Sequence, residues 1–483
     1  MEYESTIGLE VHAQLLTESK IFCGCSTKYG SPPNTQTCPV CLGLPGVLPV
    51  LNKKAVEYAI RMVLAVKGEV NPESIFARKN YFYPDLPKGY QISQYEKPLS
   101  IGGFIEIETD SGKKKIGITR IHLEEDAGKS LHPEGESEEE TSVDMNRCGV
   151  PLIEIVSEPD ISSPQEAYLY LTKLRQIVEY LGICSGNMEE GALRCDANVS
   201  VRPKGAEKLG VNTEVKNMNS FRAVEKALSY EIKRQIDILE KGSTLEKETL
   251  LWDEKKQISS VMRTKEESPD YRYFPEPDLV TLAVSQEWID RIKKSLHELP
   301  DEKRQRFVAK YKIPEYDAGV LTSSKDLADY YEECLKCHPD PKTVSNWVMG
   351  EVLRELNERK IEIKNFKIVP TDLTDLLKQI DKGNISGKMA KEIFAQMAKT
   401  GTSASEIIKE KGLAQITDKK ELGRIVKEVL IENPENVKMY HAGKEKLFTF
   451  FVGQVMKKTE GKANAKLVNE ILKAKLTTED KDK

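Results

Sequence analysis

Hydrophobic and polar positions alternate in residues 7–14 with the two-residue period of a β-strand. Successive side chains of a strand point to opposite faces, so Glu10, His12 and Gln14 share one face, and the apolar residues between them take the other. The pattern predicts a half-buried strand with one polar face.

Two further strand-like stretches carry carboxylates. Residues 122–126 read His-Leu-Glu-Glu-Asp, and Glu154 is the single carboxylate in the otherwise apolar run 152–156. A buried carboxylate is costly unless it is paired or bound to a metal. Oxygen ligands with one imidazole favour Mg²⁺ or Mn²⁺ over zinc. The pattern leaves a second interpretation open, in which these carboxylates form ion pairs with the arginines at 120, 147 and 194.

Clear helix signals are few before residue 290. Ser163 followed by Pro164 predicts a helix start, and the apolar spacing continues at helical period to Gly182. A second helix is expected over residues 220–242. Because strands and helices do not alternate regularly, residues 1–290 are predicted to form an α+β domain with a largely antiparallel sheet.

Helical patterns dominate from residue 291. We expect helices near 327–331, 344–356 and 386–397, a linker at 401–403, and three short amphipathic helices at 421–431, 445–456 and 465–472. The predicted organisation is therefore an α+β domain over 1–290, an all-helical domain over 291–400 and a small helical tail domain over 401–483.

The composition is that of a soluble globular protein. The 483 residues are 39% hydrophobic and 31% charged, enough for several domains. No apolar run approaches the ~20 residues that cross a bilayer. The acidic N-terminus lacks the features of a signal peptide. We therefore expect a cytoplasmic protein with no membrane partner.

Charge is distributed unevenly. Residues 401–483 hold 17 lysines and arginines against 13 acidic residues, whereas the rest of the chain holds 55 against 64. A basic end on an acidic body indicates a candidate nucleic-acid-binding tail. A lysine-rich surface exposed only to solvent is an equally common explanation.

Four of the nine cysteines form two close pairs, Cys23 with Cys25 and Cys38 with Cys41, separated by twelve residues. This spacing predicts a structural zinc site whose four thiolates leave no open coordination position. The one-residue spacer of the first pair is less usual than two. Residues 334–338 match a haem-attachment motif, which we attribute to coincidence because no export signal is present.

Nucleotide-binding signatures are missing. The Gly-Lys-Ser at 128–130 lacks the preceding glycine of a P-loop, since Leu123 stands at that position. A bound nucleotide would instead require a metal on the sheet with nearby cations. Arg194 and Asp196 begin a run of polar side chains on one face of residues 194–200, which predicts a wet cavity or an ordinary exposed strand face.

Several long motifs occur in an order that resembles one family. They lie at residues 7–12, 78–85, 122–130, 151–160, 188–191 with 194–198, and 270–278. Together they resemble the B subunits of the aspartyl/glutamyl-tRNA amidotransferases, and the resemblance spans nearly the whole chain, the tail included.

The resemblance implies an ATP-dependent carbon-nitrogen ligase that serves protein synthesis. Such a subunit phosphorylates the side-chain carboxylate of glutamate or aspartate on misacylated tRNA(Gln) or tRNA(Asn), and ammonia then displaces the phosphate. The family's cradle domain is similar in fold to the catalytic sheet of glutamine synthetase. Mg²⁺ with cationic side chains would neutralise the charge that develops during phosphoryl transfer.

The resemblance also implies particular site residues. The family's Mg²⁺ site falls on His12, Glu125 and Glu154, with Glu10 on the same strand face. The four-cysteine set corresponds to a zinc site that only some members have. For contacts with phosphate groups and the tRNA acceptor end we select three polar residues: Lys79, Arg194 and Asp196.

The partners follow from what the chain lacks. It has no amidase signature with a serine nucleophile, so ammonia must come from elsewhere. In the family an amidase A subunit supplies it through a channel, and a small C subunit clamps A to B. Two rival classes remain to be tested, a stand-alone ATP-dependent amide ligase and a zinc-containing RNA scaffold without catalysis. The sequence does not decide which misacylated tRNA is the physiological substrate.

Overall fold

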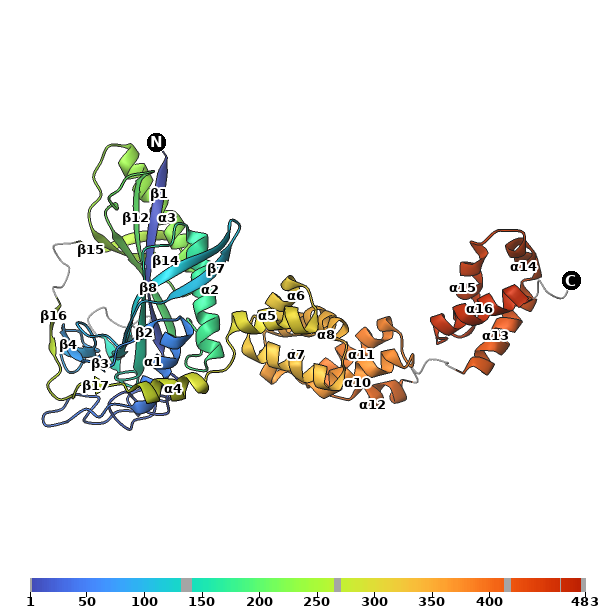
Figure 1. The fold of residues 1–483 in the computed structure, drawn as a ribbon, viewed down its shortest axis with the longest axis horizontal. Helices are drawn as coiled ribbons and strands as arrows, with labels where there is room; N and C mark the ends of the chain where they lie inside the picture. Colours follow the sequence, from blue (N-terminus) through green and yellow to red (C-terminus); the bar gives the residue numbers. More distant parts are fainter. Residues whose placement is uncertain (1, 132–140, 265–270, 412–417, 461, 479–483) are drawn as a thin grey trace. The chain divides into compact units, whose positions relative to one another are not determined.

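In a computed structural model the chain divides into two compact units, residues 1–300 and 301–483 (Figure 1). Among the described residues, none of the helices combines the length and the hydropathy that a membrane crossing requires. The structure describes residues 2–131, 141–264, 271–411, 418–460 and 462–478.

The first unit is built on a ten-stranded sheet in the order β15-β14-β13-β12-β1-β11-β8-β6-β2, with β7 paired to β8. All its pairs are antiparallel except β13 with β14. The mixed α+β class is thus confirmed. The strands are β1 (Tyr3–Gln14), β2 (Glu69–Val70), β6 (Ser100–Ile101), β7 (Phe104–Thr109), β8 (Gly112–Glu125), β11 (Pro151–Ser157), β12 (Leu193–Pro203), β13 (Thr213–Lys216), β14 (Glu248–Asp253) and β15 (Ile258–Thr264).

The apolar face of this sheet forms the core of the first unit. In β1, Ile7, Leu9, Val11 and Ala13 are all fully buried, so the predicted alternation is confirmed. Helices pack over this face, and α2 and α3 run side by side (Figure 1). They are α1 (Lys53–Ala65), α2 (Pro164–Tyr180) and α3 (Phe221–Glu240).

Helix α2 begins as its sequence predicts. The Ser163 side chain accepts a hydrogen bond from the backbone N–H of Glu166, and Pro164 occupies the first turn. These contacts satisfy or remove N–H groups that have no partner within the helix. Gly182, with a φ of +64°, follows the helix end and adopts the left-handed backbone that glycine tolerates.

Three small sheets and a short helix complete the first unit. A three-stranded sheet has the order β16-β4-β5, and β3 pairs with β17 and β9 with β10. The strands are β3 (Glu73–Ser74), β4 (Ala77–Asn80), β5 (Tyr90–Ser93), β9 (Lys129–Leu131), β10 (Ser142–Asp144), β16 (Arg272–Pro275) and β17 (Leu282–Ala283), and the helix is α4 (Gln286–Lys294).

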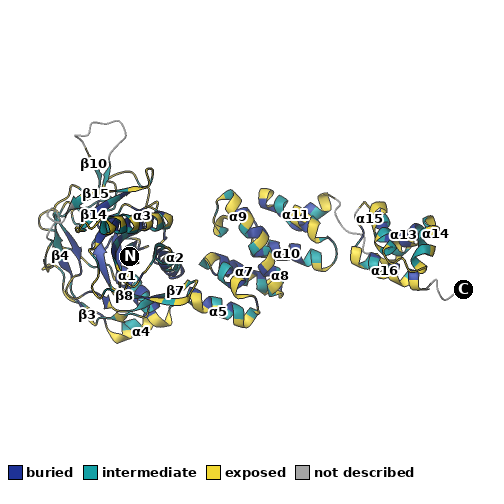
Figure 2. Ribbon diagram, turned by 90° about the horizontal axis from the view of Figure 1, so that it is seen from above, coloured by how far each residue is buried: buried dark blue, intermediate teal, exposed yellow. Residues whose placement is uncertain are grey.

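The second unit is helical and contains two separate apolar cores. Helices such as α7, α10, α11 and α13 bury one side and expose the other, as the burial colours show (Figure 2). The helices are α5 (Pro300–Tyr311), α6 (Glu315–Leu321), α7 (Lys325–Cys337), α8 (Pro341–Trp347), α9 (Leu353–Arg359), α10 (Pro370–Asp381), α11 (Gly387–Thr400), α12 (Ala404–Glu410), α13 (Lys419–Glu432), α14 (Pro434–His441), α15 (Leu447–Lys458) and α16 (Ala465–Thr478).

Two details differ from the sequence prediction. The segment expected as one helix over 344–356 contains a π-helical stretch, Val348–Val352, between α8 and α9. The boundary placed at 401 would assign α12 to the tail, but Ala404 and Ile407 of α12 are buried in the same core as α10 and α11. The second core is formed by α13, α15 and α16, so it begins after α12.

Glu332 on α7 holds α5 through hydrogen bonds from Arg306 Nη1 (2.6 Å) and Tyr311 Oη (2.7 Å). Burial opposes ionisation of this carboxyl, but the Arg306 and Tyr311 hydrogen bonds outweigh it and lower its pKa to about 2. A carboxylate whose pKa is lowered by folding stabilises the protein above its unfolded pKa. That stability is lost as the pH falls through the folded pKa.

We therefore expect Glu332→Gln to lower the free energy of unfolding of the helical unit by about 1–2 kcal/mol at neutral pH, discounted for partial exposure. The difference from wild type should shrink as the pH falls from about 4.5 towards about 2. Chemical denaturation across this pH range measures it. The neighbouring exposed Glu333→Gln is the matched control, and equal effects of the two variants would contradict the prediction.

Candidate functional site

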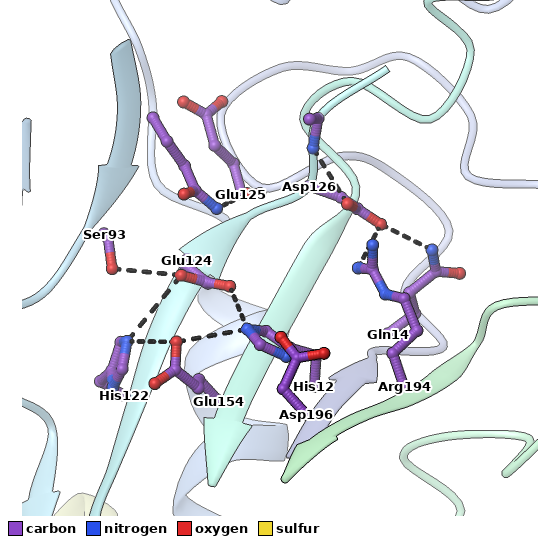
Figure 3. A network of polar contacts seen from close by, with 12 residues as sticks. His12, Gln14, Ser93, His122, Glu124, Glu125, Asp126, Glu154, Arg194 and Asp196 are labelled. Atoms are coloured by element: carbon purple, nitrogen blue, oxygen red, sulfur yellow. Dashed lines mark hydrogen bonds and ion pairs between the residues drawn. The ribbon is translucent and has the colours of Figure 1, made fainter. Parts of the chain in front are cut away.

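Two histidines and two glutamates meet on the polar face of the large sheet. His12 lies directly opposite Glu154 across β1 and β11, and Glu154 lies opposite His122 across β11 and β8. Glu124, two residues beyond His122, projects from the same face of β8 (Figure 3). The antiparallel register therefore gathers side chains from three strands into one cluster, which we call the acidic cluster.

The ligand atoms of the acidic cluster face one another. His12 Nε2 lies 3.3 Å from Glu124 Oε1 and 3.3 Å from Glu154 Oε2. His122 Nε2 lies 3.5 Å from Glu154 Oε2. One ligand atom each from His12, Glu124 and Glu154 lies within 4.8 Å of the others, the separation expected of groups that can share a cation. Two carboxylates and one imidazole suit Mg²⁺ or Mn²⁺.

The electrostatics of the acidic cluster favour the charged form of Glu154. Burial opposes ionisation of Glu154, yet the charge of His122 and the hydrogen bonds from His12 and His122 hold its pKa well below the usual range. Burial likewise opposes protonation of His122, but Glu154 and Glu124 raise its pKa to about 9. His122 and His12 thus stabilise the negative charge of the Glu154 carboxylate.

The alternative of arginine pairing does not describe this cluster. Arg194 Nη2 lies 2.8 Å from Asp126 Oδ2, and Arg147 Nε lies 3.6 Å from the same oxygen. Within the described residues, the ion pairs recorded for Glu124 and Glu154 are with histidines alone. The donor set of the acidic cluster therefore fits a divalent cation.

Glu125 lies apart from the acidic cluster. Its carboxylate forms a buried ion pair with Lys88 and accepts a hydrogen bond from the Ile92 backbone N–H at 2.8 Å. It points away from His12 (Figure 3). Of the metal ligands expected from the resemblance, the structure brings together His12 and Glu154 but not Glu125. Glu124 occupies the place beside His12 and Glu154 that the resemblance assigned to Glu125.

Glu10 lies one strand position along the same face of β1. Its carboxylate accepts a hydrogen bond from Asn198 Nδ2 at 3.1 Å. Burial, together with the charges of Glu154, Glu214 and Asp196, raises its pKa. Glu10 therefore lies beside the cluster at a position where its neighbours oppose its ionisation, and it is not among the three groups within 4.8 Å.

The polar row predicted on β12 is confirmed for Arg194, Asp196 and Asn198, which are half-buried and alternate with buried apolar residues, whereas Ser200, the last of the row, is itself buried. Arg194 lies opposite His12 and Asp196 lies opposite Glu10. These side chains are already engaged, however. Arg194 pairs with Asp126, and the Asp196 carboxylate pairs with Lys216.

A cavity of about 530 Å³ opens beside this row. It is large enough for part of a substrate, and its lining is polar with several charged groups. Its lining includes Gln14, Arg147, Arg194 and Asp196.

Lys79 approaches the cluster from β4 of the three-stranded sheet. Its Nζ lies 4.7 Å from the centre of the Tyr271 ring. Burial opposes its protonation, but Glu124 and Glu154 raise its pKa, so the amine is charged. Lys79 is thus a cation whose charge interacts with the carboxylates of Glu124 and Glu154.

The four cysteines also meet, each offering a sulfur within 4.8 Å of the others. Hydrogen bonding from Cys23 lowers the pKa of Cys41 to about 4. The fully buried Lys20 places its Nζ 3.6 Å from Cys41 Sγ. A buried ammonium requires a nearby anion, so this contact favours a thiolate at Cys41. The donor set fits a structural zinc ion.

We expect Cys38→Ser to reduce zinc content and lower the Tm, while the folded fraction retains activity. Structural zinc contributes ~10–16 kcal/mol of apparent binding free energy in small modules, but a large core should survive losing one ligand. Elemental analysis and thermal unfolding measure both effects. The exposed Cys337→Ser is the matched control. Wild-type protein without zinc, or a stable variant without activity, would contradict the prediction.

A sheet whose polar face carries an acidic, histidine-containing cluster, followed by a helical unit, is the arrangement of a catalytic domain with an appended helical domain. The model of the GatB/GatE catalytic domain matches residues 5–290, and the model of the GatB domain matches residues 329–476. The chain belongs to the GatB family.

Relatives match over nearly their full length. The chain is 59% identical to the B subunit of the aspartyl/glutamyl-tRNA(Asn/Gln) amidotransferase of Thermodesulfovibrio yellowstonii, over 98% of this chain and 99% of the relative. It is 59% identical to the protein of the same name in Caldanaerobacter subterraneus subsp. tengcongensis, over 99% of this chain and 100% of the relative. The corresponding B subunit of Geotalea uraniireducens is 56% identical, again over 99% and 100%.

Proposed function

We propose that this chain is the subunit of an ATP-dependent, tRNA-dependent amidotransferase that activates and amidates the amino acid on misacylated tRNA. The substrates are glutamyl-tRNA(Gln), aspartyl-tRNA(Asn) or both, and the product serves protein synthesis. Relatives with more than half of their residues identical carry the name of such a subunit. The acidic cluster is the observation that carries the proposal, because it supplies a site for phosphoryl transfer.

The chemistry has two steps. A carboxylate is a poor electrophile, so one side-chain carboxylate oxygen first attacks the γ-phosphorus of ATP, forming an acyl phosphate and releasing ADP. Ammonia then attacks the acyl carbon, the C–O bond to phosphate breaks, and the proton that the nitrogen loses passes to the departing phosphate, so the products are an amide and hydrogen phosphate. Both steps develop negative charge on oxygens, which nearby positive charge stabilises.

His12, Glu124 and Glu154 would hold Mg²⁺ or Mn²⁺, with Glu10 at the adjacent position on the same face of β1. The ion, when bound, neutralises phosphate oxygens during the transfer. Lys79 is placed to bind a phosphate oxygen as a charged amine. Arg194 is positioned by its ion pair with Asp126 and faces the cavity. Asp196, held by Lys216, borders the same cavity and would orient polar groups of the substrate.

The partners and the remaining features follow from membership of a multi-subunit enzyme. We propose that an amidase A subunit releases ammonia from glutamine and that a small C subunit joins A to this chain. The zinc site maintains the fold of residues 20–50. The basic tail binds the body of the tRNA. We also propose that the large sheet corresponds to the catalytic sheet of glutamine synthetase, supported by its antiparallel strands and acidic face.

The deciding experiment supplies the assembled complex with ATP, Mg²⁺ and ammonium, together with glutamyl-tRNA(Gln) or aspartyl-tRNA(Asn). ADP formation that requires a misacylated tRNA, with amidation of its amino acid, supports the proposal. ADP formation with free glutamate alone would identify a stand-alone ligase. Binding of tRNA without any ADP formation would identify a scaffold. Comparing the two tRNAs also determines the substrate range.

A further inference from the structure

Four tyrosines on and beside the strands of the three-stranded sheet form two aromatic pairs, which together we call the aromatic wall. Tyr95 and Tyr273 stack with ring centres 4.2 Å apart and planes inclined by 13°. Tyr81 and Tyr271 meet edge to face at 5.6 Å. Tyr95 is 48% exposed, so its ring is not part of a core. Aromatic rings held rigidly at a surface are typical of binding sites.

The aromatic wall flanks the acidic cluster. Lys79 lies opposite Tyr273 on one side and Gln91 on the other, so the three side chains share a face of the three-stranded sheet. On β5 of the same sheet, Ser93 Oγ donates a hydrogen bond to Glu124 at 3.3 Å. Burial raises the pKa of Tyr273, and the charges of Glu154 and Glu124 act in the same direction. The wall therefore lies beside the acidic cluster.

We infer that the aromatic wall binds the unpaired 3′-terminal nucleotides of tRNA by stacking, an inference that rests on the proposed function. The amino acid is esterified to the terminal ribose. When its side-chain carboxylate reaches the acidic cluster, the terminal base lies within one nucleotide's length of it. Single-stranded RNA is bound through stacking on aromatic side chains beside cations, and such stacking tolerates any base. Lys79 supplies the cation.

The extent of the aromatic surface favours a strand of RNA over the single adenine of ATP. Beyond the end of β4, Tyr83 extends the wall, because its ring lies 5.8 Å from that of Tyr81, and the adjacent Phe82 is 85% exposed. The single adenine of ATP covers one ring face, whereas several successive unpaired bases of RNA need several ring faces. Adenine of ATP as the occupant is the competing outcome of the test.

The test uses the full chain and a short single-stranded RNA ending in CCA, with 2-aminopurine at the 3′ terminus. Binding should quench the fluorescence, because the base stacks on tyrosine. Tyr273→Leu and Tyr95→Leu should each weaken binding by roughly 5-fold to 100-fold, the range of one base stack. Tyr273→Phe keeps the ring and should bind like wild type, which separates lost stacking from misfolding. Tyr316→Leu, at a 74% exposed tyrosine of the helical unit, is the control.

A second readout uses the assembled complex. The KM for misacylated tRNA should rise in Tyr273→Leu by a similar factor, while the KM for ATP and the glutaminase rate stay unchanged. Wild-type affinity of the Leu variants for the RNA would overturn the inference, as would a raised KM for ATP with unchanged RNA binding. RNA binding is measured without ATP or Mg²⁺. Wild-type protein that binds the RNA by stacking but never forms ADP would therefore refute the proposed function without contradicting this inference.

Discussion

We expect Glu154→Gln to abolish ATP-dependent phosphorylation of misacylated tRNA, with a loss of roughly 100-fold or more. An amide keeps the shape of the side chain but removes a negative ligand from a hard cation. It also leaves His12 and His122 without the carboxylate that lies 3.3 Å and 3.5 Å from them. Losing one well-placed electrostatic contact in a dry site costs 10²–10³ in rate, roughly, in comparable cases. ADP release with misacylated tRNA, measured at saturating ATP, tests the prediction.

The control for Glu154→Gln is Glu207→Gln, a carboxylate exposed on the same unit. Glutamine hydrolysis by the partner amidase should remain measurable in both variants, although coupling between subunits can lower its rate. Binding of Mn²⁺ to the isolated chain provides a readout that does not depend on turnover. Wild-type amidation by Glu154→Gln would show that this carboxylate is not a ligand.

Adjacent glutamates on β8 offer a sharper comparison. Glu124→Gln should lose phosphorylation as Glu154→Gln does, because its carboxylate faces His12. Glu125→Gln should instead destabilise the fold by about 3 kcal/mol, because Lys88 loses its buried partner, while molecules that remain folded still form the acyl phosphate. Loss of phosphorylation in folded Glu125→Gln with full activity in Glu124→Gln would restore the assignment that the family resemblance implies.

The second large effect concerns the tail. A chain that ends at Lys411 should still assemble with its partners and release ammonia from glutamine, but its affinity for tRNA should fall. Ending there keeps α12 with its own core, whereas ending at Thr400 would remove the buried Ala404 and Ile407. Amidation should fail mainly through a raised KM, because the acidic cluster lies entirely in the first unit.

The salt dependence identifies the contacts that are lost. Each phosphate contact contributes roughly 0.7–0.9 to the slope of log K against log salt, so truncation should flatten the slope. Filter binding across a salt series measures both affinity and slope. Replacing the exposed Lys427, Lys446 and Lys466 together by glutamine should reproduce part of the change without removing a helix. Unchanged affinity and slope after truncation would mean that the tail does not bind tRNA.

Features that depend on neighbouring residues were predictable. The alternation in residues 7–14 placed Glu10 and His12 on one face, because the pleat of a strand imposes a period of two. Ser163 and Pro164 predicted the start of α2 through local hydrogen bonding. The spacing of Cys23, Cys25, Cys38 and Cys41 predicted that they would meet, since short loops can close on one ion.

Pairings between distant segments required the folded chain. The two-residue period of a strand places Glu124 on the face of His122 and Glu125 on the other, but only the register of β8 against β11 brings that face to His12. His122 joins for the same reason. A signal for both was available, since His122 and Glu124 are two residues apart and must share a strand face.

The same distinction applies to the aromatic wall and the helical unit. Tyr81 and Tyr271 stand 190 positions apart in the sequence, and nothing local to either one indicates that β4 and β16 pair. The assignment of α12 to the core that it shares with α10 and α11 depended on which apolar residues its buried side chains join. Side-chain direction along a strand or helix is a local property of the backbone, whereas the choice of partner is set by the packing of the whole core, which only the tertiary structure reveals.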